Sequence, residues 1–429
     1  MRNATGPDQN PMQFHILSFE GPDPYSMVGG LGTRIHGLTE ALGTLGHEVH
    51  LWFIGDPKRP GHEVRDGVHL HRWCQWMSEY KPGGVYDGEN EKAADYARSL
   101  PPFMLQRIML PHLLQGGRAA VLAEEWQTVN AVLHLDWLLQ QSGMRDRVTM
   151  AWNANNTFGF EAIDWARLQS AASITAVSKY MKHRMQEWGI PAAVVPNGLP
   201  DDAYAPPDRV AVRDLRRGFG ERIVLTKMAR WDPDKRWLAT VSIAAQMKRE
   251  GWKPLLIARG GTEPHGAEVL ASAQQYGLKI IERTAPTGSG MRGMVEALGN
   301  VGDADVVHLR SFVDPHGRRA LFRASDAVLA NSSHEPFGLV GLEAMAVGGI
   351  ACTGCTGEDY AVPGGNALVL QTSEPGEFIG QFSRLRQDPG QAARMRRAGR
   401  ATARQYAWRE VIEGSLLPWL SLADASRAA

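Results

Sequence analysis

The chain has 429 residues, 43% of them hydrophobic and 21% charged, and its 46 Lys and Arg residues balance 46 Asp and Glu residues. This composition is typical of a soluble globular protein, and the length suggests two or three domains. A formal net charge of zero argues against nucleic acid as the main partner. No apolar run is long enough to cross a bilayer and the first residues lack the pattern of a secretion signal, so we expect a cytoplasmic protein without membrane association.

The apolar pattern begins after Met12, and residues 1–11 are expected to be a disordered tail or an extended start. From there, apolar runs of strand length alternate with helical stretches. In the first half the runs begin at Phe14, Glu48, Gly67, Ala120, Arg147, Ser173 and Ala192. In the second half they begin at Arg222, Lys253, Leu278, Ala304, Asp326, Gly349 and Ala367. This alternation predicts an α/β fold with two doubly wound, Rossmann-like parallel sheets.

The segment from Gly198 to Asp214 is rich in Pro and Asp and poor in apolar periodicity, which predicts a linker. We therefore expect one domain over residues 12–204, a second over 215–404 and a C-terminal helical segment over 405–429. Because ligands bind at the carboxyl ends of parallel strands, two such sheets are expected to place their sites across a central cleft.

The first candidate loop, "VGGLG", contains Gly29, Gly30 and Gly32, which allow a ligand to approach the backbone ahead of an amphipathic helix. A dinucleotide-dependent oxidoreductase would require G-x-G-x-x-G, but Ile35 stands at the third glycine position. The oxidoreductase interpretation is therefore disfavoured.

An aromatic-rich stretch from Trp73 to Met104 follows in the first domain. Its aromatic residues are Trp73, Trp76, Tyr80, Tyr86 and Tyr96. Aromatic faces suit stacking on sugar rings, although packing in the core or in a lid explains them equally well.

Two cations follow the first strand of the second domain in "MARWDPDKRW". Arg230 ends the strand, and Lys235 stands at the start of the next helix, which Asp232 or Asp234 would cap. Both would lie at the carboxyl edge of the sheet, where they could neutralise a departing diphosphate. An ordinary surface pair is the alternative.

The stretch "NSSHEPFGLVGLEAMAVGG" places Glu335 in a loop and Glu343 in the following helix. A helix beginning near Gly338 would leave the backbone amides of Phe337, Gly338 and Leu339 free to bind phosphate. Both carboxylates can reach this nest, which suits a ligand with phosphate in the middle and hydroxyl groups at both ends. The alternative is a helix with one glutamate at its start and another on a solvated face.

Two further patterns have simpler explanations. Cys352 and Cys355 have C-x-x-C spacing, but no second pair completes a zinc site and the histidines are scattered, so we expect neither a metal nor a cofactor. The arginine-rich stretch from Arg384 to Arg404 is expected to be a solvated helix face, with a surface for an anionic partner as the alternative.

Four motifs in this order resemble the large family of retaining glycosyltransferases that includes starch and glycogen synthases, sucrose synthases and bacterial mannosyl- and glucosyltransferases. "HEPFGLVGLEAMAVGG" is similar to the E-x7-E signature of the family and "ARWDPDK" to its Arg-x4-Lys pair. "VVPNGL" is similar to the turn that closes the first domain and "VGGLG" to the glycine loop of the synthases. The resemblance covers residues 14–422 and implies the GT-B fold.

The resemblance implies a role for each candidate residue of the second domain. Glu335 would hold sugar hydroxyls, Glu343 the ribose, and the Phe337–Leu339 amides the diphosphate, while Arg230 and Lys235 would stabilise the leaving group. The "TGCTGEDY" loop would wall the donor pocket, and the last helix would cross back to the first domain. The first domain would bind the acceptor.

The chain departs from the family pattern at two positions. Met27 stands where the synthases begin the glycine loop with lysine, and Trp152, in "MAWNANN", stands where the family has a histidine. These departures put activity and stereochemistry in question and make Trp152 and Asn153, together with Trp73 and Trp76, candidates for the acceptor side.

The sequence thus predicts a hexosyltransferase that moves glucose from a nucleoside diphosphate sugar to a small hydroxylated or saccharide acceptor, with retention of configuration. The alternative is a catalytically inactive nucleotide-sugar-binding protein. The oligomeric state is not predicted.

Overall fold

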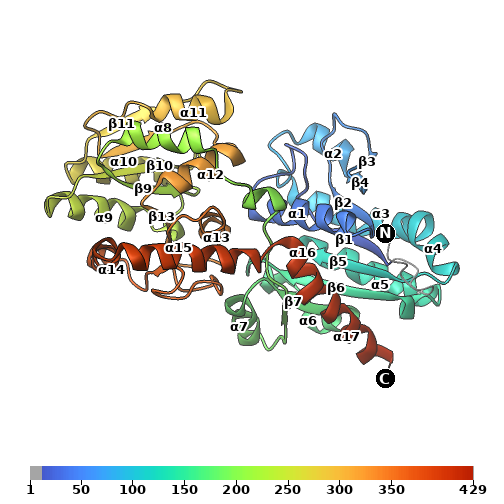
Figure 1. The fold of residues 1–429 in the computed structure, drawn as a ribbon. Coiled ribbons are helices and arrows are strands. Elements are labelled where there is room, and N and C mark those ends of the chain that lie inside the picture. Colours follow the sequence, from blue (N-terminus) through green and yellow to red (C-terminus); the bar gives the residue numbers. More distant parts are fainter. Residues whose placement is uncertain (1–11, 429) are drawn as a thin grey trace, which may run out of the picture. The chain divides into compact units, whose positions relative to one another are not determined.

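A computed structural model describes residues 12–428, with side chains described as far as Ala423. The predicted tail over residues 1–11 lies outside the described residues. The chain divides into two compact units, one ending at Gly198 but including the segment from Trp408 onward, and one from Leu199 to Ala407 (Figure 1). The sequence predicts boundaries at residues 204, 215 and 405, of which the first and the last lie close to these.

The first unit is built on an eight-stranded sheet of order β3-β4-β2-β1-β5-β6-β7-β8. Its strands are β1 (Gln13–Leu17), β2 (Glu48–Ile54), β3 (His62–Arg65), β4 (Val68–Trp73), β5 (Ala119–Glu124), β6 (Val148–Ala154), β7 (Ser173–Ala176) and β8 (Ala193–Val194). All neighbours pair in parallel except β3, which is antiparallel to β4 at the edge. The seven predicted strands are confirmed, and β3 was missed.

Helices cover both faces of this sheet, so its central strands are buried throughout. The helices are α1 (Gly30–Thr44), α2 (Gln75–Tyr80), α3 (Glu89–Met104), α4 (Leu110–Leu114), α5 (Val129–Gln141), α6 (Trp165–Ala171), α7 (Lys179–Glu187), α16 (Trp408–Val411) and α17 (Leu417–Ala428). Double-sided burial explains why these strands read as nearly continuous apolar runs.

The second unit is built on a seven-stranded parallel sheet of order β11-β12-β10-β9-β13-β14-β15. Its strands are β9 (Ile223–Met228), β10 (Pro254–Arg259), β11 (Ile280–Arg283), β12 (Val306–Leu309), β13 (Ala327–Ala330), β14 (Ala351–Thr353) and β15 (Leu368–Val369). Its helices are α8 (Arg209–Phe219), α9 (Trp237–Arg249), α10 (His265–Gln275), α11 (Gly290–Leu298), α12 (Pro315–Ala324), α13 (Leu339–Ala346), α14 (Pro375–Gln387) and α15 (Pro389–Arg404). All seven predicted strands are confirmed.

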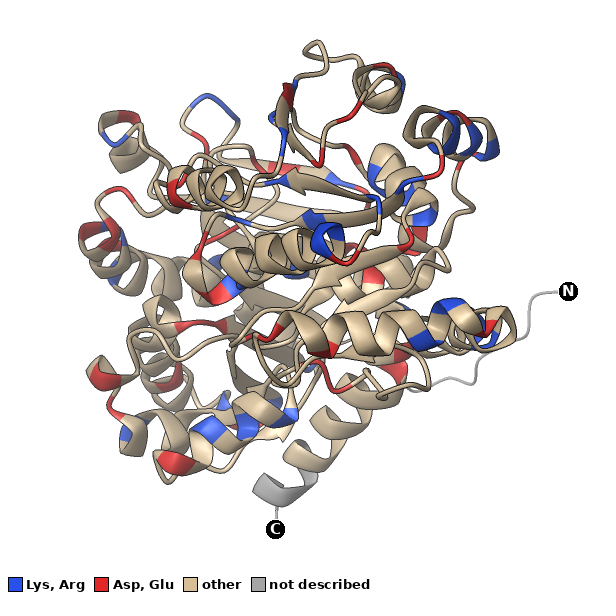
Figure 2. Cartoon of the chain, turned by 90° about the vertical axis from the view of Figure 1, so that its left-hand side faces the viewer, with Lys and Arg blue, Asp and Glu red and all other residues tan. Residues whose placement is uncertain are grey.

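Basic and acidic residues are interspersed along the helices of the chain (Figure 2), in keeping with the balanced composition. Among the described helices, none combines the length and the apolar character that crossing a membrane requires.

Trp408 anchors the C-terminal segment to the first unit. Its side chain is 2% exposed and packs in the same core as residues of β1 and β2. Two glycines make room for the indole, because a Cβ atom at Gly37 would lie 2.2 Å from Nε1 and one at Gly198 would lie 2.5 Å from Cδ2. The Arg34 guanidinium lies 5.6 Å from the ring centroid. Figure 1 shows α16 and α17 in red alongside the strands of this unit.

We expect Trp408→Ala to lower the free energy of unfolding of the first unit by about 3–5 kcal/mol, because it leaves a cavity where the indole fills the core. Chemical denaturation followed by circular dichroism measures this loss. Trp137, which lies on α5 and is 55% exposed, provides the matched control, and Trp137→Ala should change stability by no more than about 0.5 kcal/mol. Equal effects of the two substitutions would contradict the anchoring role.

Candidate functional site

The candidate site of the second unit lies where two neighbouring strands end. Strands β9 and β13 pair in parallel, so the loops that follow them emerge at the same edge of the sheet. Ser333, in the loop after β13, donates its backbone amide and its hydroxyl to the carbonyl oxygen of Asp234, over 2.8 and 3.1 Å. The loops are therefore joined directly.

An ion pair connects the predicted cation and the predicted carboxylate. Lys235 Nζ lies 2.7 Å from Glu335 Oε2, and both side chains are about one-fifth exposed, at 19% and 20%. Lys235 lies in a 3₁₀ turn, Pro233–Lys235, capped by the Asp232 side chain, and α9 begins two residues later than expected at Trp237. The structure thus brings Lys235 and Glu335 together across a hundred residues of sequence.

Two more cations lie close by in the sequence, Lys227 on β9 and Arg230 in the loop that follows this strand. Arg230 is exposed, and its guanidinium makes no hydrogen bond or ion pair with the side chains that the structure describes. Lys227 was not predicted; it is buried and donates to Asn331 Oδ1 over 2.7 Å and to the Leu329 carbonyl over 3.2 Å. Burial lowers the pKa of Lys227 to about 7. A lysine inside an apolar strand was the signal that could have identified it.

Gly338 fixes the start of α13, as predicted. It is the N-cap residue with φ of 81°, a conformation that favours glycine, and a Cβ atom there would lie 2.8 Å from Glu358 Cγ. Phe337 is buried beside the rings of Tyr360 and Tyr406. The first amides of α13, beginning at Leu339, have no acceptor within the helix and form an end that favours an anion.

Glu358 is a buried carboxyl group that the sequence analysis did not single out. Its Oε2 accepts a hydrogen bond from the Thr356 amide over 3.1 Å, and the Thr356 hydroxyl accepts one from the Glu335 amide over 2.9 Å. No partner for Glu358 Oε1 occurs in the described part of the chain. Burial, followed by the charge of Glu335, raises the pKa of Glu358 to about 7.

The Glu343 side chain does not lie on a purely solvated face of α13. Its Oε1 lies 3.1 Å from Nη2 of Arg318 on α12, while its Oε2 is buried without a partner among the described residues. Burial raises the pKa of Glu343 and the Arg318 charge opposes that rise. One carboxylate oxygen is therefore engaged and the other is left to accept a hydrogen bond.

The glycine loop of the first unit is occupied by a carboxylate of the chain itself. Glu20 Oε2 accepts hydrogen bonds from the amides of Val28, Gly29 and Gly32 over 3.1, 3.1 and 2.9 Å. Tyr86 donates its hydroxyl to Glu20 Oε1 over 2.6 Å. The amide of Gly29, which we expected to face a ligand, is thus paired with Glu20, and Gly30 begins α1.

The candidates expected on the acceptor side are largely internal. Trp152 is fully buried and donates Nε1–H to the carbonyl oxygen of Glu125 over 2.9 Å. Asn153 is buried as well, donating to Glu124 Oε2 over 2.8 Å and accepting from the Thr175 hydroxyl over 2.9 Å. Because β6 is covered on both faces, the Trp152 side chain has no exposed surface with which to contact an acceptor in this arrangement.

The aromatic stretch divides between the core and the surface. Trp73 is partly buried against Phe103 and donates to the Ser99 hydroxyl over 2.7 Å, and Tyr96 is fully buried. Trp76 and Tyr80 are 60% and 76% exposed on α2. The exposed pair keeps the capacity to stack on a ligand.

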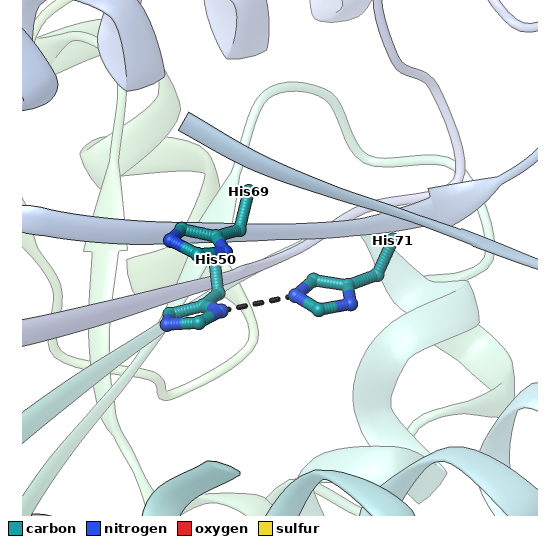
Figure 3. Close-up of side chains that lie close together, drawn as sticks. All are labelled: His50, His69 and His71. Atoms are coloured by element: carbon teal, nitrogen blue, oxygen red, sulfur yellow. Dashed lines mark hydrogen bonds between the residues drawn. The ribbon is translucent and has the colours of Figure 1, made fainter. Parts of the chain in front are cut away.

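In the described part of the chain, one group of three His, Cys, Asp or Glu side chains has ligand atoms that all lie within 4.8 Å of one another. All three of its members are histidines. His50 comes from β2, and His69 and His71 from β4 (Figure 3). His50 Nδ1 and His71 Nε2 lie 2.9 Å apart, and the rings of His50 and His69 stack at 4.5 Å. The three come together because β2 and β4 are neighbouring strands and because His69 and His71 occupy alternate positions on β4. No sequence motif indicates this group.

The stacked geometry does not preform a metal site. A metal ion lies in the plane of each imidazole that binds it, and two near-parallel rings whose centroids are 4.5 Å apart share no such plane. His71 also lies flat on Trp52, at 3.8 Å, and His50 Nε2 pairs with Glu48. We interpret the group as a neutral packing network, and the expected absence of a metal or cofactor stays a prediction.

Two family models match the chain in the order of its units. The model described as Glycosyltransferase Family 4 matches residues 28–203, and the one described as Glycosyl transferases group 1 matches residues 292–402. The chain belongs to the group 1 glycosyltransferases.

Among curated proteins, the chain is similar to D-inositol 3-phosphate glycosyltransferases. It is 31% identical to that of Actinosynnema mirum over 54% of this chain and 52% of the relative. It is 29% identical to that of Gordonia bronchialis over 32% of this chain and 31% of the relative. The match thus spans about half, or less, of the length of these relatives.

Solved structures show the same fold at low sequence identity. A sucrose-phosphate synthase from Thermosynechococcus elongatus is 18% identical, with a TM-score of 0.65 over 96% of this chain and 100% of the other. The catalytic domain of starch synthase IV from Arabidopsis thaliana is 15% identical, with a TM-score of 0.69 over 97% of this chain and 100% of the other. The GT-B fold expected from the sequence is confirmed.

Glu358 should make stability depend on pH near the site. Its pKa is raised from 4.5 to about 7 on folding, so the folded state holds the proton more tightly and stability falls as pH rises through this window. Glu358→Gln removes this loss, and its stability relative to the natural chain should be higher at about pH 8 than at about pH 5 by on the order of 3 kcal/mol. Urea unfolding at both pH values measures the difference. The exposed Glu374→Gln should show no pH-dependent difference, and an equal difference at both pH values for Glu358→Gln would contradict the assignment.

The histidine network should make the first unit sensitive to acid. Burial lowers the pKa of His50 to about 4 and that of His71 to about 2, from an ordinary value of 6.5. As pH falls, these histidines therefore bind protons in the unfolded chain before they do so in the folded chain. The free energy of unfolding then decreases below about pH 6.5 by about 1.4 kcal/mol per pH unit for each such group. His71→Gln should reduce this slope in denaturation curves recorded from about pH 6.5 to about pH 4.5. The exposed His183→Gln should not, and an unchanged slope in both variants would show that the network is not the cause.

Proposed function

We propose that this glycosyltransferase moves a hexose from a nucleoside diphosphate sugar to a small hydroxylated or saccharide acceptor, with retention of configuration. Glucose is the first sugar to test. The contact between Lys235 and Glu335 carries this proposal, because it holds a cation and a hydroxyl-binding carboxylate at one edge of the sheet, beside the N-terminus of α13.

The donor chemistry follows from the charges around that edge. The first amides of α13, together with Lys235 and Arg230, supply donors and positive charge for a diphosphate. Glu335 can accept hydrogen bonds from the sugar, and the unpartnered oxygen of Glu343 from the ribose. This set of donors and acceptors matches a ligand in which a diphosphate separates two hydroxyl-bearing rings.

The proposed transfer needs no protein base. The acceptor hydroxyl oxygen forms a bond to the anomeric carbon on the face from which the bond to the diphosphate oxygen breaks. The departing phosphate oxygen takes the hydroxyl proton, and the bond electrons leave with the diphosphate. Lys235 and Arg230 would neutralise the charge that develops there, so the rate would come from positioning and electrostatic stabilisation.

For the acceptor, we propose a phosphorylated polyol as the first candidate within the broader class. The curated relatives are named D-inositol 3-phosphate glycosyltransferases, and the chain is about 30% identical to them over the matched residues. Trp76 and Tyr80 are two exposed aromatic side chains of the first unit that could stack on such a ring.

The second candidate is a nucleotide-sugar-binding protein without transfer activity. It is motivated by Glu20, whose carboxylate fills the glycine loop of the first unit by accepting from three amides. It would bind the donor through the second unit and release no diphosphate.

Lys235→Ala and Glu335→Gln should each lower kcat by about 100-fold or more, because each removes a group proposed to act in the transition state. The assay is release of nucleoside diphosphate from UDP-, GDP- and ADP-glucose, with and without an acceptor pool that contains inositol 3-phosphate. His334→Gln, an exposed neighbour of Glu335, should keep the natural rate. Acceptor-dependent release that survives both substitutions would overturn the site, whereas tight donor binding without release would establish the binding protein.

A further inference from the structure

A second concave site lies in the second unit, away from the loops described above. It is a cavity of about 650 Å³ lined by α8, by the ends of α12 and α13, by α15, and by the segment from Tyr204 to Pro207. Its volume falls within the range of small-molecule sites, about 300–1,000 Å³.

Arginines dominate the lining. Three come from one face of α15, where Arg396, Arg400 and Arg404 repeat at intervals of four residues. The sequence analysis expected the arginines of this helix to be a solvated face. The structure instead divides them, since Arg394 and Arg397 on the same helix do not line the cavity.

Two other helices of the lining add four more arginines, Arg209, Arg213 and Arg216 on α8 and Arg323 on α12. Asp326 is the one carboxylate of the lining, and Arg216 lies 3.1 Å from it. The lining therefore contains seven arginines and a single acidic group.

Several of these arginines lack an anionic partner. Arg209, Arg323, Arg400 and Arg404 form no ion pair with any carboxylate that the structure describes. Arg323 is half-buried, and its pKa is lowered by burial and then by the charge of Arg400. Arg396 donates to the Gly348 carbonyl over 3.0 Å, yet its pKa is lowered as well, first by burial and then by Arg323. The chain thus gathers positive charge that it does not neutralise itself.

The cavity is separate from the candidate donor site. Ser325 and Asp326, which line it, precede β13, whereas Glu335 follows that strand. The cavity likewise meets Ala346 and Val347 at the C-terminal end of α13, whereas Gly338 caps the other end. The two sites therefore lie at opposite edges of one sheet and at opposite ends of one helix.

We propose that this cavity is a binding site for a small molecule that carries two phosphate groups, such as a sugar or polyol bisphosphate. Guanidinium groups recognise phosphate through paired hydrogen bonds. Because the arginines come from three helices, one phosphate cannot contact them all, and two phosphates on a compact frame can. Pro206, Pro207 and Val212 supply the apolar wall for that frame.

Isothermal titration of the full chain with fructose 1,6-bisphosphate, glucose 6-phosphate and inorganic phosphate, at constant ionic strength, tests the proposal. The bisphosphate should bind more tightly than either monophosphate. Arg400→Gln should weaken its binding about tenfold or more, because it removes a charge-assisted contact. Arg397→Gln removes the same charge from the same helix outside the cavity and should change Kd by no more than about twofold.

Lys235→Ala distinguishes this site from the donor site, and bisphosphate binding should be unaffected by it. Three outcomes would overturn the proposal: no bisphosphate binding, equal weakening by Arg400→Gln and Arg397→Gln, or loss of binding in Lys235→Ala. Binding to phosphatidylserine vesicles that depends on Arg400, without bisphosphate binding, would also overturn it and assign the arginines to a lipid surface. Because Arg400 belongs neither to the donor site nor to the transfer mechanism, these outcomes leave the transferase proposal to its own assay.

Discussion

The parallel pairing of β9 with β13 is the constraint on which the candidate site depends. Parallel strands end at the same edge of a sheet, so the loops after them must be neighbours whatever their separation in sequence. The contact of Lys235 with Glu335 fixes the distance between those loops. β9 and β13 are central strands of the sheet, with β10 and β14 on their outer sides. The polar groups at the ends of these two strands are therefore attached to a rigid part of the core.

Several ionisable groups near this edge are shifted toward their neutral forms, whereas in water at neutral pH they would be charged. Lys227, Glu343 and Glu358 are each largely withdrawn from solvent, and burial moves the pKa of each toward the neutral form. Such groups destabilise a folded chain unless they are paired, and they concentrate where function needs a strong local field. Lys235 offsets the charge of Glu335 by direct contact, whereas Glu358 has no such cation and the Glu335 charge adds to the rise of its pKa.

The sequence predicted the sheets well and the contacts within them less well. Buried parallel strands reveal themselves as apolar runs, which is why the strand ending at Met228 and the one ending at Ala330 were found. The strand over His62–Arg65 was missed because it is short, lies at an edge and alternates without a strong apolar face. Glu20 and Glu358 were missed for another reason: each acts on a loop distant in sequence or across a turn, and no spacing rule encodes such a contact. The burial of Trp152 could not be read from the sequence either, because a motif position indicates a place on a strand and not the exposure of the side chain.

The path of the chain through its two units has a consequence for biosynthesis. The first unit is built mainly from the residues up to Gly198, yet Trp408 and the helices after it complete its core. Since a ribosome makes the chain from its N-terminus, the first unit stays unfinished until the whole of the second has been synthesised. Until then the groove reserved for the Trp408 indole, between Gly37 and Gly198, exposes apolar surface to the cell. A nascent chain of this design therefore offers chaperones a defined binding surface, and a truncated product would keep that surface permanently open.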